Sequence, residues 1–261
     1  MRTKGHGLWV AVLLSWAAVA TAGVQTKEVD YTQGDTALQG TLAWDDALPG
    51  TRPGVLVVHE WWGHNAHARR AAERLARAGY VAFALDMFGK GKVTTHPAEA
   101  QAFVAEATKD PAVMEARFAA ARAQLEQDPH VDRHRIAAIG YCFGGAVVLG
   151  RALAGDDLVA VATFHGALGY AHPTGKDAIK ARILVMTGTD DPMVPAAQVA
   201  TFEKEMKAAG ARFRIIRYPG ARHSFTNPDA DKVGMSELAY NAEADRKSWA
   251  AMLAMFKQAL K

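Results

Sequence analysis

The sequence predicts an α/β fold, a three-layer sandwich in which helices cover both faces of a mostly parallel central sheet. Three observations support this class. Apolar runs of strand length alternate with helical stretches from residue 54 onward. These runs are apolar throughout instead of alternating, which indicates strands buried on both faces. Half of the 261 residues are hydrophobic and 22% are charged, which is enough apolar material for one large core.

The individual elements follow from local patterns. Residues 26–33 and 37–44 flank the turn Gly34-Asp35 and predict a short antiparallel pair. Continuous apolar runs predict six further strands, at 54–60, 80–88, 135–142, 158–166, 182–190 and 212–220. Helical stretches, two of which end near a glycine, lie at 66–80, 113–128, 146–154, 196–210 and 236–260.

The first 22 residues have the pattern of a secretory signal peptide. Arg2 and Lys4 precede a nearly continuous apolar run, and Ala20-Thr-Ala22 supplies a small-x-small cleavage site. The run is shorter than the roughly 20 residues that a membrane span needs. We therefore expect a signal peptide at 1–22, cleavage after Ala22, export to the periplasm or medium, and a single domain at 23–261.

Charge and cysteine content narrow the function classes. Removal of Arg2 and Lys4 lowers the formal net charge from +3 to +1, so no global field would attract nucleic acid or an anionic membrane. The chain has one cysteine, Cys142, so no internal disulfide can form. We expect a monomer held together by core packing that acts on a small molecule.

The cysteine lies in an unusual local sequence. Gly140-Tyr-Cys142-Phe-Gly144 follows an apolar strand and precedes a predicted helix. This G-x-C-x-G pattern is typical of a nucleophile elbow, a turn so sharp that both flanking positions must lack a Cβ atom. The elbow exposes the thiol above the sheet, and the helix N-terminus offers backbone N–H groups to an oxyanion. Cys142 is therefore a candidate nucleophile.

A nucleophile elbow predicts an acid and then a histidine later in the chain. Asp190 and Asp191 both follow the strand at 182–190, and either can supply the acid. His223 lies in the loop after the last predicted strand. A thiol, an acid and a histidine in this order, each at a strand end, predict a catalytic triad.

A fourth strand ends in His59-Glu60-Trp61-Trp-Gly-His64. A zinc protease needs two histidines four residues apart on a helix, whereas these are five apart and a glycine intervenes, so we expect no metal and no cofactor. In a nucleophile-elbow fold, the loop after this strand donates the second oxyanion N–H. A carboxylate in this loop would face the nucleophile.

Five segments together resemble the dienelactone hydrolase family of α/β-hydrolases over about residues 27–260. They are VHEWWGHN, ALDMFGKG, IGYCFGGA, GTDDPMVP and GARHSFTNP. The resemblance implies that Cys142 is the nucleophile, Asp191 the triad acid and His223 the base. Asp191 is preferred to Asp190 because the family pattern reads G-x-x-D-x-x-V-P.

The resemblance assigns further roles. Glu60 matches a carboxylate that contacts the resting thiol and takes its proton once substrate displaces it. The expected oxyanion donors are the backbone N–H groups of Trp61 and Phe143. Well-studied members hold the carboxylate of dienelactone with two arginines. Here the matching positions are Lys90 and Asn227, which weakens anion binding because lysine lacks the bidentate fork and asparagine is neutral.

Trp61 and Trp62 indicate a bulky apolar wall for the substrate pocket. The sequence therefore predicts an exported hydrolase that cleaves an ester or lactone bond in a small molecule through a Cys-His-Asp triad. The alternative is a non-catalytic ligand-binding or thiol-redox module on the same fold.

Overall fold

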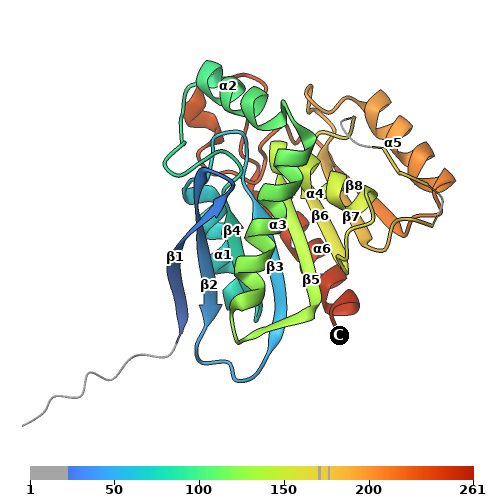
Figure 1. Cartoon of the computed structure of the whole chain (residues 1–261). Helices are drawn as coiled ribbons and strands as arrows, with labels where there is room; N and C mark the ends of the chain where they lie inside the picture. The colour runs from blue at the N-terminus through green and yellow to red at the C-terminus, as the bar shows by residue number, and fades with distance from the viewer. Residues whose placement is uncertain (1–22, 170–171, 176) are drawn as a thin grey trace, which may run out of the picture.

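The computed structural model describes residues 23–169, 172–175 and 177–261, and it confirms the predicted three-layer α/β sandwich (Figure 1). The described residues form an eight-stranded sheet of order β1-β2-β4-β3-β5-β6-β7-β8. The pairs β1–β2 and β2–β4 are antiparallel, and every later pair is parallel. The parallel strands therefore all direct their carboxyl ends to one edge of the sheet.

The strands lie close to their predicted positions. Their bounds are β1 Val24–Gln33, β2 Thr36–Asp45, β3 Arg52–Val58, β4 Val81–Leu85, β5 Val131–Tyr141, β6 Ala160–Phe164, β7 Arg182–Gly188 and β8 Phe213–Tyr218. The central strands β4 and β6 are buried along their whole length, as expected for strands covered on both faces.

Helices cover the sheet on both sides. Their bounds are α1 Ala66–Arg77, α2 Pro97–Thr108, α3 Pro111–Gln127, α4 Phe143–Leu153, α5 Ala196–Ala208, α6 Ala242–Ala259 and the 3-10 helix η1 Ala230–Val233. Buried residues of α3, α4 and α5 share one core cluster, and those of α1 and α6 share a second on the opposite face. Each face of the sheet thus has its own core.

Two helices differ from the prediction. The closing helix begins at Ala242 instead of 236, because the Asn241 side chain caps it by accepting a hydrogen bond from the Ala244 N–H at 3.0 Å. The residues before this cap form a loop in which Leu238 is buried and pairs with the chain at His223. Helix α2 was not predicted, because only two of its residues are buried and its apolar periodicity is weak.

The predicted signal peptide at 1–22 lies outside the described residues. Among the helices that the structure describes, none is long and apolar enough to cross a membrane.

Candidate active site

Cys142 is the N-cap residue of α4 and has a left-handed backbone, with φ 51° and ψ −115°. A positive φ is uncommon in a non-glycine residue, and here the sharp turn from strand β5 into helix α4 imposes it. A Cβ atom on Gly140 would lie 2.0 Å from the Gly144 carbonyl oxygen, and one on Gly144 would lie 2.4 Å from the Val58 oxygen. Both glycines of the predicted elbow are therefore required. The Cys142 N–H donates to the Phe164 oxygen at 3.1 Å and ties the turn to β6.

The acid and the histidine meet beside this turn. His223 Nδ1 lies 2.8 Å from Asp191 Oδ2, and both side chains are almost completely buried. The other Asp191 oxygen accepts backbone N–H bonds from Met193 at 2.8 Å and Val194 at 3.2 Å, which fixes the carboxylate in place. Asp190 is exposed and accepts only from its neighbour Thr189. The structure thus brings Asp191, and not Asp190, to the histidine.

The electrostatics around His223 favour its charged form. Burial alone would lower the pKa of His223, but the negative charge of Cys142 and the hydrogen bond to Asp191 outweigh burial and raise the pKa from 6.5 to about 10. Asp191 accepts from Nδ1, so the second ring nitrogen, Nε2, is left to exchange a proton. Nε2 is buried and has no hydrogen-bond partner within the described part of the chain. The arrangement can hold a thiolate–imidazolium pair.

Glu60 is bound by two side chains other than the thiol. It is buried, and its two oxygens accept hydrogen bonds from Ser224 Oγ and from Asn227 Nδ2, each at 2.6 Å. No hydrogen bond joins Glu60 to Cys142 among the residues that the structure describes. A buried carboxylate with two donors is well satisfied where it is.

The two predicted oxyanion donors lie on adjoining segments. The Gly144 N–H donates to the His59 oxygen at 3.1 Å, which holds the start of α4 against the end of β3. The rings of His59 and Phe143 stack with centroids 6.0 Å apart. Within the described ranges, neither the Trp61 nor the Phe143 N–H donates to a protein group. Both donors are therefore available to a substrate oxygen.

The two tryptophans differ in their surroundings. Their rings are 4.7 Å apart, but Trp62 is only 3% exposed whereas Trp61 is half-buried. Trp62 packs in a small core cluster with Ala100, Ala230 and Leu238. Trp62 thus supports the loop, and Trp61 is the one with free surface.

The structure does not bring Lys90 into this cluster. Its ammonium pairs with Asp30 on the edge strand β1 at 2.6 Å, and both side chains are exposed. Asn227 is brought to the site, but its amide donates to Glu60. The two positions expected to contact a substrate anion are each engaged with another carboxylate.

Sequence reasoning did not single out Ser224 or His165. Ser224 stands next to His223 and has a left-handed φ of 55°, which turns its hydroxyl toward Glu60. His165 follows β6, is fully buried, and packs its ring 5.1 Å from that of His223. Burial lowers the pKa of His165 well below 6.5, so it stays neutral beside the charged histidine. Its Nε2 bonds with Thr226 Oγ1 at 2.9 Å. The segment GARHSFTNP contained the signal for Ser224, and an apolar strand ending in a histidine was the only signal for His165.

No group of three or more metal-ligating side chains occurs in the described ranges. His59 and His64 are engaged separately. His59 Nε2 accepts from the Met87 N–H at 3.1 Å, and His64 Nε2 bonds with Thr41 Oγ1 at 3.1 Å.

Comparison with known proteins gives a consistent result. The model of the dienelactone hydrolase family matches residues 38–260. A Synechocystis protein assigned as a carboxymethylenebutenolidase is 30% identical over 256 residues, which cover 92% of this chain and 100% of the relative. A dienelactone hydrolase-like promiscuous phosphotriesterase, P91 from metagenomic libraries, is 36% identical with a TM-score of 0.85, and the match covers 92% of this chain and 100% of that one. A Klebsiella pneumoniae structure assigned as a dienelactone hydrolase is 25% identical with a TM-score of 0.77, covering 90% and 99%.

Proposed function

Since this chain belongs to the dienelactone hydrolase family and is thus a carboxylic ester or lactone hydrolase, we propose that it works through a Cys142–His223–Asp191 triad on neutral substrates outside the cytoplasm. The observation that supports the triad most strongly is the buried His223–Asp191 pair beside the elbow cysteine. It orients the imidazole so that Nε2 serves the thiol.

The reaction has two steps. The Cys142 sulfur, as a thiolate, forms a bond to the substrate carbonyl carbon, and the carbonyl oxygen takes the displaced electron pair. The Trp61 and Phe143 N–H groups hold this oxyanion. When the tetrahedral intermediate collapses, the carbon–oxygen bond to the alcohol breaks, and His223 gives its proton to the leaving oxygen. Water then attacks the thioester, His223 takes a proton from it, and the acid leaves as Cys142 is restored.

The contacts of Glu60 support a proposal for the first proton transfer. Because Ser224 and Asn227 hold both Glu60 oxygens, His223 is the group placed to accept the thiol proton in the arrangement described. Glu60 would have to leave both donors before it served the thiol. We therefore propose that His223 takes the proton of Cys142, and that Glu60 stays bound to Ser224 and Asn227 during this step.

The contacts of Lys90, Asn227 and Glu60 bear on the choice of substrate. The Lys90 ammonium pairs with Asp30 and the Asn227 amide donates to Glu60, so neither position offers a substrate carboxylate an unpaired cation. A fixed carboxylate at Glu60 repels an anionic substrate, at a cost of about 1 kcal/mol or more depending on the local dielectric. Together these contacts favour a neutral ester or lactone over dienelactone, whose carboxylate would need a cationic partner.

The deciding experiment is steady-state hydrolysis by the protein that begins at Gly23. A neutral short-chain aryl ester, dienelactone and an aryl phosphotriester would be compared, the last because P91 is described as a phosphotriesterase. We expect kcat/KM for the neutral ester to exceed that for dienelactone, and Cys142→Ala to abolish turnover of both. Turnover that survives in Cys142→Ala would refute the triad. Stoichiometric thiol modification without turnover would support the redox module instead.

Export is tested separately. The full chain would be expressed in a bacterium with two membranes and the fractions analysed by mass spectrometry. We expect the periplasmic or secreted protein to begin at Gly23, because Ala20-Thr-Ala22 supplies the cleavage site. A cytoplasmic protein that retains Met1 would contradict export but leave the triad intact.

A further inference from the structure

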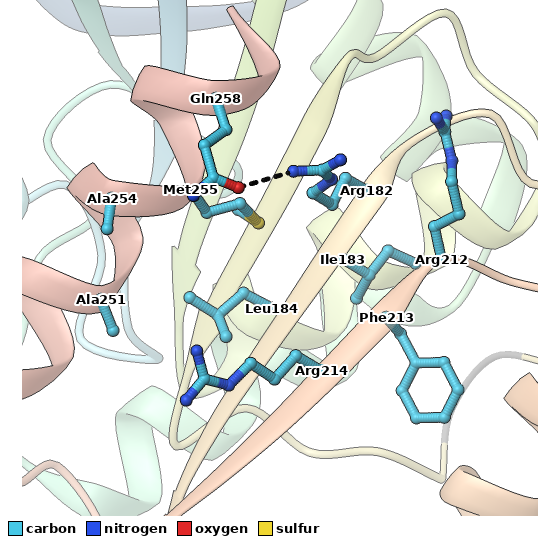
Figure 2. A pocket seen from close by; sticks show the side chains of 10 residues that line it. All are labelled: Arg182, Ile183, Leu184, Arg212, Phe213, Arg214, Ala251, Ala254, Met255 and Gln258. Atoms are coloured by element: carbon cyan, nitrogen blue, oxygen red, sulfur yellow. Dashed lines mark hydrogen bonds between the residues drawn. The ribbon is translucent and has the colours of Figure 1, made fainter.

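A groove with a volume of about 340 Å³ lies at the edge of the sheet opposite the catalytic residues (Figure 2). It is formed where β7 and β8 begin and where the last turns of α6 cross them. Asp191 and His223 follow the other ends of these two strands. Since β7 has seven residues, the groove is roughly 20 Å from the catalytic edge, at about 3.3 Å of rise per residue. The groove is therefore separate from the active site.

The strand register gathers arginines on one face of this groove. Leu184 pairs with Arg214 in the parallel β7–β8 ladder, so both side chains face α6, and Arg182 shares this face because it is two residues from Leu184. Farther along β8, the same face continues with Ile216 and Tyr218, which pack into the α6 core. Arginine thus replaces apolar residues where this face of the sheet comes into contact with solvent.

These arginines lack acidic partners. No carboxylate lines the groove, and none of Arg182, Arg212 and Arg214 forms an ion pair within the described part of the chain. Arg182 donates only to Gln258 Oε1 at 3.1 Å, and Arg212 donates to a backbone oxygen. By contrast, Arg217 on the same strand pairs with Glu203 at 3.3 Å. The groove therefore carries uncompensated positive charge.

The floor between these charges is apolar. Figure 2 shows Leu184 and Met255 between the guanidinium groups of Arg182 and Arg214, with Ala251 and Ala254 on α6 beside them. The volume falls at the small end of the range of about 300 to 1,000 Å³ that is typical of small-molecule sites. A planar guanidinium matches a carboxylate through two parallel hydrogen bonds.

We propose that this groove is a second ligand site, which binds an organic anion with a carboxylate head and an unbranched apolar body. The arginines hold the head and the Leu184–Met255 floor covers the body. The carboxylic acids released by ester hydrolysis have this chemistry. The proposal does not depend on Cys142, because no catalytic residue lines the groove.

Calorimetric titration of the mature protein tests the site with octanoate as the probe and octanamide as its neutral match. Cys142 is first alkylated with iodoacetamide to keep the probe out of the active site; it is the only cysteine in the chain. We expect one octanoate per chain, bound roughly tenfold or more tightly than octanamide, since a charge-assisted pair contributes more than about 1.4 kcal/mol. The double variant Arg182→Gln/Arg214→Gln should lose this preference.

Two further variants sharpen the result. Arg217→Gln removes a paired arginine from the same strand and should change octanoate affinity by less than about twofold. Ala254→Glu places a carboxylate at an exposed helix position beside the arginines and should weaken octanoate roughly tenfold without disturbing the core. Equal binding of octanoate and octanamide, or unchanged octanoate binding in the double variant, would overturn the proposal.

Discussion

Two pairs of loops meet at the catalytic edge of the sheet, and each buries a histidine next to the start of α4. The loops after β7 and β8 carry Asp191 and His223, and the loops after β3 and β4 carry His59 and its partner Met87. Both histidines are almost completely buried. Their pKa values nevertheless move in opposite directions, up to about 10 for His223 and below 6.5 for His59.

The difference comes from the partners. His59 Nε2 accepts from the Met87 N–H and its Nδ1 faces the Glu60 carbonyl oxygen, so two backbone groups satisfy a neutral ring with the proton on Nδ1. Burial lowers the pKa of His59 further than Asp86 and Glu60 raise it. His223 instead has a carboxylate on one side and the thiol on the other. Burial lowers the pKa of both rings, and only at His223 do the charge of Cys142 and the hydrogen bond to Asp191 outweigh it.

The largest effect is expected when the Asp191–His223 pair, which joins the loops after β7 and β8, is broken. In Asp191→Asn, a neutral amide that can also donate replaces the carboxylate, so the Nδ1–H tautomer is no longer enforced and the imidazolium loses its stabilising charge. We expect kcat/KM for a neutral aryl ester to fall by about 10³ to 10⁴, and the thermal midpoint at pH 7 to fall as well because the buried His223 loses its charged partner. Steady-state kinetics with a thermal melt would measure both.

The adjacent residue supplies the matched control. Asp190 is exposed, and among the described residues its side chain bonds only to Thr189, so Asp190→Asn should keep kcat/KM within about twofold of the wild type. Equal losses in the two variants would mean that the acid has been misassigned.

The pH dependence of stability tests the His223 pair next. Because its pKa is raised in the folded state, His223 stabilises the fold fully below about pH 6.5, and this contribution is lost as the pH rises toward about 10. The difference in free energy of unfolding between the wild type and His223→Gln should therefore shrink by a few kcal/mol between pH 6 and pH 10. Urea titrations at several pH values would measure it, and a constant difference would contradict the pair.

His59 should show the opposite slope. In His59→Gln, the Met87 N–H loses a well-placed acceptor, which costs about 1 to 3 kcal/mol at pH 7. Wild-type His59 is neutral when folded and charged when unfolded in acid, so its advantage over the variant should shrink as the pH falls below 6.5. Urea unfolding from pH 7 to pH 5 measures this change. If the advantage of the wild type over His59→Gln were instead lost as the pH rises above 7, the two histidines would not differ as described.

The sequence predicted the parts of this site that local rules determine. The elbow glycines, the order of thiol, acid and histidine, and the strand ends that carry them all follow from turn sterics and parallel topology. The position of Asn227 was predictable, but its partner was not. The segment GARHSFTNP places the Asn227 amide four residues after His223, so its position near the histidine was predictable. The hydrogen bond from this amide to Glu60, however, joins residues 167 positions apart. Such a bond depends on how two loops pack.

The elements that were misplaced share a physical reason. Helix α2 exposes most of its surface, so its sequence lacks the periodicity that marks a helix packed on a sheet. The start of α6 depends on Asn241 as a cap, and the apolar pattern upstream belongs to a loop that buries Leu238 against the His223 segment. In both cases the apolar pattern reported burial and not helix formation: α2 is a helix without that pattern, and the loop before α6 has it without being a helix.

The smallest expected effect concerns the loop after β4. Lys90 and Asp30 form an exposed pair, and pairs of this kind contribute about 0 to 1 kcal/mol. Because this pair points the ammonium to the edge strand, Lys90→Ala should change kcat/KM by less than about twofold for both dienelactone and a neutral aryl ester. Parallel steady-state assays would measure both values. A selective rise in KM for dienelactone would show that Lys90 leaves Asp30 to bind the substrate anion, and the loop after β4 would then join the loops after β7 and β8 as part of the working site.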